Sequence, residues 1–190
     1  MMPGQGLSGR VRDSKNGVIA ASSQEAIPRD QAAFVAMVEP VLPAAYRLAV
    51  GMLRSDSEAE DVVQEAMFRA WRHFGQFRQG AEMRPWLLTI VANECRRQRR
   101  SRWSWVVKTS DAIDRSEPED PDLGAQGADL RRALYRLPHD QRLVLVLRYY
   151  LDLSFDEVAQ VLKISTKAAK SRAYRALERL RLSPEVLADA

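Results

Sequence analysis

The sequence predicts an all-α protein of two small helical domains joined by a flexible acidic linker. Apolar residues recur at the three- and four-residue spacing of amphipathic helices, and no segment alternates as a half-buried strand does. The charges are also segregated, because an acidic segment separates two basic ones. Residues 151–182 show two helices with a tight break between them, which is the pattern of a helix-turn-helix.

The chain begins with a segment that lacks apolar periodicity. Residues 1–28 are rich in small and polar side chains and are predicted to be a disordered leader. Residues 29–53 predict helix, with a kink or break at Pro40 and Pro43 because proline has no N–H to donate. No stretch is expected to be long and apolar enough to span a bilayer, and no secretory signal is recognised. We therefore expect a cytoplasmic protein without membrane insertion.

A second helix is predicted after a short turn and runs to about Phe74, with Asp56 or Ser57 as its N-cap. Its apolar residues define one face, and the outer face or its edge carries three polar residues: Asp61, Gln64 and Glu65. A solvated acidic helix start explains these residues from the sequence alone. Residues 75–83 then form a loop that holds the aromatic Phe77 and the cation Arg78 among polar neighbours.

A third helix is predicted to begin at Arg84-Pro85, since proline is tolerated in a first helical turn. Trp86 is interpreted as an anchor of its buried face. Polar residues on or near the other face are Asn93, Arg96, Arg97 and Arg100. An arginine run followed by Trp103 and Trp105 mixes cations with aromatics, as phosphate contacts and base stacking on single-stranded DNA require.

Residues 109–128 are acidic, contain proline and glycine, and are predicted to be a linker that buries no core. The second domain is expected over residues 129–182, and residues 183–190 form a short tail. A helix that Pro138 terminates precedes an apolar helix over residues 139–150. We interpret His139 as a helix-start residue, because no partner ligand lies at zinc spacing.

The helix-turn-helix itself begins with Ser154, which forms a capping box with Glu157. Lys163 lies at the turn, where this motif often has glycine, and a left-handed lysine costs roughly 1 kcal/mol. Ser165 or Thr166 caps the second helix, which would enter the major groove. The candidate DNA contacts on this segment are Ser165, Thr166, Lys167, Lys170, Ser171, Arg172 and Arg175. The alternative is that this basic face is merely solvated.

Composition limits the possible functions. The net charge is only +4, but basic residues concentrate in residues 84–108 and 163–181, which favours two contacts with a polyanion. The alternative is that the charged blocks only aid solubility. The one cysteine, Cys95, excludes a disulfide framework and a cysteine zinc site. Neither a nucleophile–base pair nor a phosphate-binding glycine loop is present, so we expect no catalytic residue, no metal and no cofactor.

Several motifs occur together in one order. They are residues 56–71 (DSEAEDVVQEAMFRAW), Phe77-Arg78, Arg84-Pro85-Trp86-Leu87, Leu137-Pro138 and Lys170-Ser171-Arg172. This set resembles bacterial RNA polymerase sigma factors of the extracytoplasmic function class, group IV of the sigma-70 family. The resemblance covers about residues 30–182. It implies a sigma-2-like domain over residues 29–108 and a sigma-4-like helix-turn-helix domain over residues 129–182.

The resemblance also implies partners and sites. Asp61, Gln64 and Glu65 would dock on the clamp helices of the polymerase β′ subunit, and the β flap, promoter DNA and an anti-sigma factor are further expected partners. The residues implied for the −10 element are Phe77, Arg78, Trp86, Asn93, Arg96, Arg97 and Arg100. The helix-turn-helix contacts named above would read the −35 element, and the acidic linker would thread the channel that RNA later occupies.

Two residues depart from the family pattern. Ala168 stands where the family often has threonine, and Arg97 stands where it often has an acid. These departures put a standard −35 preference and the base-reading set in question. The alternative function is a sigma-like DNA-binding regulator or adaptor that does not melt promoters. The Phe77 loop and the acidic helix favour the initiation factor, since a simple repressor needs neither.

Overall fold

The structure is a computed structural model that describes residues 31–53, 55–78, 80–108 and 124–181. The first domain contains α1 (Gln31–Val38), η1 (Glu39–Val41), α2 (Leu42–Met52), α3 (Asp56–His73), η2 (Phe74–Gln76) and α4 (Met83–Lys108). The second contains α5 (Gly124–Arg136), α6 (His139–Leu145), η3 (Val146–Tyr150), α7 (Phe155–Leu162) and α8 (Thr166–Arg181). These ranges contain no strand, so the predicted all-α fold is confirmed.

The prolines near the start of the chain break the first helix as predicted. Pro40 lies in η1, a single 3₁₀ turn, and Pro43 lies in the first turn of α2, where a missing N–H leaves no bond unmade. The predicted N-cap of α3, Asp56 or Ser57, was wrong. Ser55, not Asp56 or Ser57, has an extended backbone, and its Oγ accepts from the amide of Glu58 at 3.4 Å.

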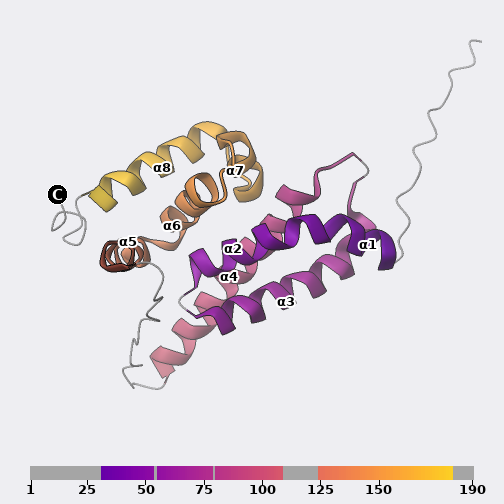
Figure 1. The fold of residues 1–190 in the computed structure, drawn as a ribbon, viewed down its shortest axis with the longest axis horizontal. Helices are drawn as coiled ribbons and strands as arrows, with labels where there is room; N and C mark the ends of the chain where they lie inside the picture. Colours follow the sequence, from indigo (N-terminus) through magenta and orange to yellow (C-terminus); the bar gives the residue numbers. More distant parts are fainter. Residues whose placement is uncertain (1–30, 54, 79, 109–123, 182–190) are drawn as a thin grey trace, which may run out of the picture.

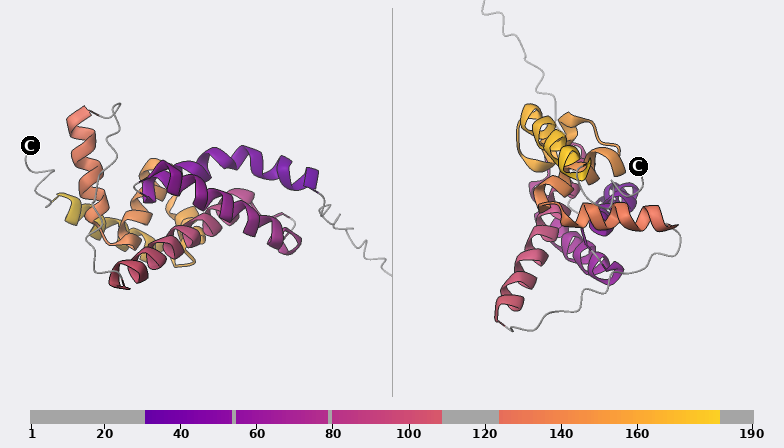
Figure 2. Two further views of the ribbon diagram at one scale, coloured as in Figure 1. Left: turned by 90° about the horizontal axis from the view of Figure 1, so that it is seen from below. Right: turned by 90° about the vertical axis from the view of Figure 1, so that its left-hand side faces the viewer.

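Helix α4 lies at the centre of the molecule. It packs against α2 and α3 on one side and against α7 of the second domain on the other (Figure 1). Leu87, Leu88, Val91, Ala92 and Cys95 are all buried, and their spacing places them on one broad face of α4. Two further views show the α5–α8 domain lying along the α4 side of the first domain (Figure 2).

The first helix near the second domain begins before residue 129, the predicted start of that domain. Helix α5 starts at Gly124, so residues 124–128 are helical and the predicted linker over residues 109–128 is wrong at its C-terminal end. The rest of that linker, the leader and the tail lie outside the described residues. The helix predicted over residues 139–150 is α6 followed by the wider π turn η3, which leaves Tyr150 52% exposed rather than packed in the core.

The helix-turn-helix forms as predicted from α7 and α8. Ser154 and Glu157 make both bonds of the capping box, at 3.2 and 2.7 Å. The turn between the helices takes the left-handed conformation at Lys163, with φ 54° and ψ 47°. The amide of Ile164 bonds the carbonyl of Ala159, which closes the Schellman arrangement that usually requires glycine.

One membrane-related prediction was wrong. The segment Gln31–Met52, with 22 residues and mean hydropathy 1.4, is long and apolar enough to cross a membrane by length and composition. The core helices of a soluble protein pass the same test, and this segment is interrupted by η1 and packs against α3 and α4. The segment therefore gives only weak support for a membrane span.

We predict that Lys163→Gly stabilises the protein. A side chain at a left-handed φ is strained, and glycine removes that strain, so the free energy of unfolding should rise by about 0.5–1 kcal/mol. Urea denaturation followed by circular dichroism measures the change. Lys163→Ala is the matched control, because it removes the same exposed side chain and keeps the strained Cβ. An equal rise in both variants would contradict this account.

Candidate functional site

Helix α8 presents a basic face that is not covered by the rest of the described chain. The small residues Ala169, Ala173 and Ala176 are buried against α6 and α7, which lets α8 approach them closely. The opposite face leaves these candidate DNA contacts exposed: Lys167, Lys170, Ser171 and Arg175. Arg172 is half-buried. A helix fixed by one alanine stripe and basic on the other side has the geometry of a recognition helix.

The two hydroxyl residues at the start of α8 have structural partners. Ser165 Oγ accepts from the amide of Ala168 at 3.2 Å and is the N-cap. Thr166 Oγ1 donates to Asp156 Oδ1 at 2.6 Å, which joins α8 to the first turn of α7. The alternative between Ser165 and Thr166 as cap is thereby resolved in favour of Ser165.

The outer face of α3 carries the predicted polymerase contacts in two different environments. Asp61 and Gln64 are exposed to solvent. Glu65 is half-buried, and its Oε1 lies 3.0 Å from Arg69 Nε and 3.2 Å from Arg97 Nη2. Glu65 therefore joins α3 to α4, whereas Asp61 and Gln64 are free to meet a partner.

A buried carboxylate between α3 and α4 was missed by the sequence analysis. The side chain of Glu94 is only 6% exposed, and it lies 2.8 Å from Arg69 Nε and 2.6 Å from Arg97 Nη2. An isolated buried carboxylate is costly, and two guanidinium groups offset that cost. Arg97 therefore faces α3 through two carboxylates. The signal in the sequence was that Glu94 is the only acid between Arg84 and Lys108.

In the predicted base-capturing loop, the aromatic Phe77 is buried and the neighbouring Arg78 is exposed. Phe77 is 8% exposed and stacks on Phe74 at 6.2 Å between centroids. Its edge also meets the half-buried Trp86 at 5.1 Å, which confirms Trp86 as a packing residue. Arg78 is exposed next to Phe77. Phe77 and Trp86 therefore pack beneath the loop and support it. Arg78 is the residue of the three that a ligand can reach.

The remaining polar residues of α4 are partly engaged by the second domain. Asn93 and Arg100 are exposed, and Asn93 Oδ1 accepts from Arg96 Nη1 at 3.1 Å. Arg96 Nε also lies 3.5 Å from Asp140 Oδ1 at the start of α6. Thr89 Oγ1 donates to the carbonyl of its own helix at Pro85 and lies 3.2 Å from the carbonyl of Val161 in α7.

Two buried titratable groups, His139 and Cys95, are uncharged at neutral pH. Burial and the nearby Arg142 lower the pKa of His139 to about 4. Burial raises the pKa of the Cys95 thiol to about 12. His139 begins α6 as predicted, and no cluster of metal-ligating side chains occurs among the described residues. Both groups therefore behave as core residues.

Two family models match the chain. The model of sigma-70 region 2 matches residues 37–104, and the model of sigma-70 region 4 matches residues 128–180. A relative, the ECF RNA polymerase sigma factor SigL of Mycobacterium tuberculosis, is 34% identical over 149 residues, which cover 75% of this chain and 83% of SigL. SigM of the same organism is 31% identical over 182 residues, which cover 94% of this chain and 88% of SigM.

Two solved structures have a similar fold. The sigma factor RpoE of Bartonella quintana, in complex with the anti-sigma factor NepR, matches with a TM-score of 0.66 and 30% identity, over 82% of this chain and 96% of RpoE. CnrH, in complex with the cytosolic domain of CnrY, matches with a TM-score of 0.61 and 26% identity, over 80% of this chain and 86% of CnrH. With both regions matched and both domains built as described above, the chain belongs to the extracytoplasmic function RNA polymerase sigma factors.

Proposed function

We propose that this chain is an alternative sigma factor that acts in the cytoplasm, binds core RNA polymerase and directs initiation at its own class of promoters. The observation that carries the proposal is the presence of two separate surfaces on one chain. An acidic, exposed face on α3 suits a protein partner, and a basic, exposed face on α8 suits duplex DNA. The protein supplies no catalysis and requires no cofactor; it positions the polymerase and opens the DNA.

Docking on the polymerase is assigned to the first domain, over residues 29–108. Asp61 and Gln64 would meet the clamp helices of the β′ subunit directly, because both are exposed on α3. Glu65 belongs to the same surface, but its carboxylate is shared with Arg69 and Arg97. We assign Glu65 the double role of contacting β′ and holding α3 against α4.

Capture of the −10 strand is assigned to the loop and to α4. Arg78, Asn93 and Arg100 would contact the strand, since all three side chains are exposed. Phe77 and Trp86 would support the pocket from below, and Arg96 would join it once released from Asp140. Extrusion of a base costs a few kcal/mol, which contacts in the pocket must offset.

Recognition of the −35 duplex is assigned to the second domain, over residues 129–182. The exposed residues of α8 would contact bases in the major groove or the flanking phosphates: Lys167, Lys170, Ser171 and Arg175. The half-buried Arg172 would lie at the edge of this contact. The β flap of the polymerase would bind this domain. An anti-sigma factor would regulate the activity of the protein. The sigma factor RpoE, which has a similar fold, is bound to an anti-sigma factor in its solved structure.

Asp61→Arg should abolish binding to core polymerase, because it reverses the charge of an exposed residue of the proposed docking face. Pull-down of core enzyme with tagged protein measures the effect. Glu60→Arg is the matched control: it makes the same charge reversal one position away, on the side of α3 that approaches Tyr46. Retained binding by Asp61→Arg would remove this face from the interface.

Lys170→Ala and Arg175→Ala should each weaken binding to upstream duplex DNA. If each side chain neutralises one phosphate, the slope of log K against log salt should fall in magnitude by about 0.9 per substitution. Fluorescence anisotropy across a salt series gives the slope. Arg47→Ala removes the same charge from an exposed site on α2 and should leave the slope unchanged. If the slope is unchanged in all three variants, Lys170 and Arg175 do not contact DNA phosphates, and the basic face of α8 is only solvated.

Arg78→Ala should spare upstream binding and impair promoter opening. The substitution removes an exposed cation and leaves the buried Phe77 in place, so the fold is preserved. Permanganate reactivity of thymines in the −10 region measures opening in the assembled holoenzyme. Full reactivity in this variant would show that the loop does not hold the strand. Absence of opening with the wild-type protein, despite core binding, would favour the adaptor.

A further inference from the structure

Two arginines and two glutamates form a closed network between α3 and α4. Glu65 Oε1 lies 3.0 Å from Arg69 Nε and 3.2 Å from Arg97 Nη2. The same two guanidinium groups contact Glu94, at 2.8 Å from Arg69 Nε and at 2.6 Å from Arg97 Nη2. Each arginine therefore divides its charge between two carboxylates, one from each helix.

The two carboxylates differ in how strongly they depend on Arg97. The side chain of Glu94 is 6% exposed, whereas that of Glu65 is 40% exposed and is screened by water. Arg97 places its short contacts on Glu94 Oε2, with Nε at 2.7 Å and Nη2 at 2.6 Å. Its contact with Glu65 is longer, at 3.2 Å. The contact with Glu65 is therefore the one that Arg97 can release at low cost.

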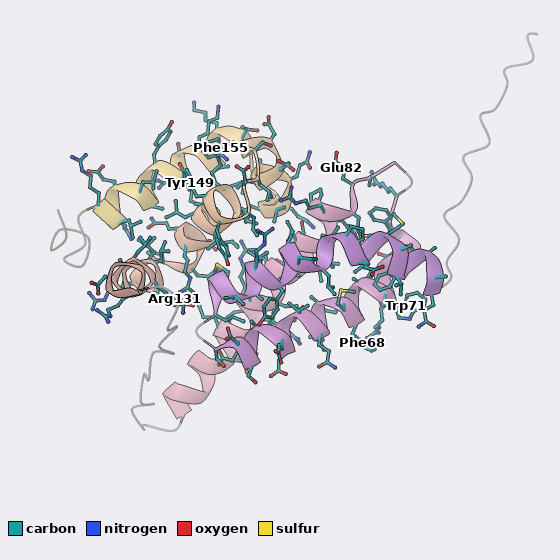
Figure 3. All side chains as sticks on the ribbon, in the orientation of Figure 1. Phe68, Trp71, Glu82, Arg131, Tyr149 and Phe155 are labelled. Atoms are coloured by element: carbon teal, nitrogen blue, oxygen red, sulfur yellow. The ribbon has the colours of Figure 1, made fainter. Side chains whose placement is uncertain are left out.

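Glu65 lies on a helix face that is open to a partner. Asp61, Gln64, Glu65 and Phe68 follow the spacing of one side of α3, and Phe68 is 56% exposed. Phe68 lies at the outer edge of α3, away from Tyr149 and Phe155 of the second domain (Figure 3). The acidic residues of this face are complementary to a basic partner surface. A cation of that partner would meet a Glu65 carboxylate that Arg69 and Arg97 already contact.

We propose that Arg97 is a positioning residue that acts on polymerase docking through Glu65, and that it does not contact the −10 strand. Its guanidinium neutralises part of the charge of Glu65 and so lowers the affinity of the α3 face for a basic surface of core polymerase. The polymerase and Arg97 compete for one carboxylate. The inference rests on the function proposed above and adds to it a residue of α4 that sets the strength of docking.

The burial of Glu94 explains why Arg97 is unsuited to the −10 strand. If a phosphate of the strand drew Arg97 away, the Glu94 carboxylate would keep Arg69 alone as its counter-charge. Removing a partner from a buried charge is strongly unfavourable. Release of the exposed Glu65 carries no such cost, because water replaces the lost contact. Arg100, which is exposed further along α4, is the cation that the strand can reach without breaking this network.

The affinity of the full-length protein for core RNA polymerase tests the inference. Arg97→Gln should lower the Kd about two- to fivefold, the range expected for releasing one partly exposed ion pair. Arg99→Gln is the matched control, since it makes the same change at an exposed position of the same helix and should leave the Kd unchanged. A Kd that is unchanged or raised in Arg97→Gln, or lowered equally in both variants, would overturn the inference.

A double-mutant cycle shows whether the effect passes through Glu65. In a Glu65→Gln background the contested carboxylate is absent, so adding Arg97→Gln should no longer lower the Kd. A gain of the same size in both backgrounds would mean that Arg97 acts without Glu65, and the inference would fail. A purely structural role for Arg97 predicts a loss of affinity in both backgrounds.

Arg97→Lys keeps the test valid if the glutamine variant folds poorly. Lysine retains a positive charge for the buried Glu94, but its ammonium lacks the planar fork with which arginine meets two carboxylates. Glu65 is then released while the net charge of the protein stays the same, so the Kd should again fall. Circular dichroism checks the fold. A folded Arg97→Lys protein that binds no more tightly than wild type would contradict the inference.

Binding of a single-stranded −10 oligonucleotide by the assembled holoenzyme gives a second measurement. Arg97→Gln should leave this affinity unchanged at saturating core polymerase, whereas Arg100→Gln should weaken it. Equal weakening by both variants would make Arg97 a strand contact and overturn the inference. If wild-type protein binds core polymerase and Arg97→Gln gives no gain, only the inference fails. If wild-type protein does not bind core polymerase, the proposed function fails and the inference fails with it.

Discussion

Helix α4 is packed from two sides, and the position of each candidate surface depends on that contact. On one side it completes a bundle with α2 and α3, and on the other it meets α7. Leu87, Leu88 and Val91 are all buried where α4 meets these neighbours. The residues that would hold the −10 strand are therefore confined to the edges that remain, at Asn93 and Arg100.

Electrostatics reinforces this arrangement. The chain is basic, yet several of its arginines pair with carboxylates: Arg69 and Arg97 share the buried Glu94, and Arg96 lies near Asp140. Such pairing keeps charged groups close to apolar contacts without leaving one unpaired, which would be strongly unfavourable. It also limits the basic surface that DNA can reach, so that α8 carries the most open cationic face.

Much of the fold was predictable because its signals are local. The capping box at Ser154, the alanine stripe of α8 and the break at Pro40 depend on neighbours within a turn, and all three form as predicted. The absence of glycine at the turn counted against the motif in the sequence, yet Lys163 takes the left-handed conformation there. The motifs shared with sigma factors then placed the domains in order along the chain.

The features that the sequence did not predict are contacts between residues far apart in the chain. No local pattern indicates that Tyr135 caps α2, that Asp140 meets Arg96, or that Gly51 lies against η3. Nor does a local pattern indicate that Arg97 pairs with Glu65 and Glu94. Periodicity predicts the helix face on which a residue lies. It does not predict which side chains of a distant helix contact that face.

Run-off transcription tests the central claim most directly. Purified protein would be added to core RNA polymerase on a library of promoter fragments, with core alone as the reference. The account predicts discrete transcripts that depend on the protein and that share two sequence elements upstream of their start sites. A protein that binds core polymerase tightly and yields no specific transcript from any fragment would contradict it.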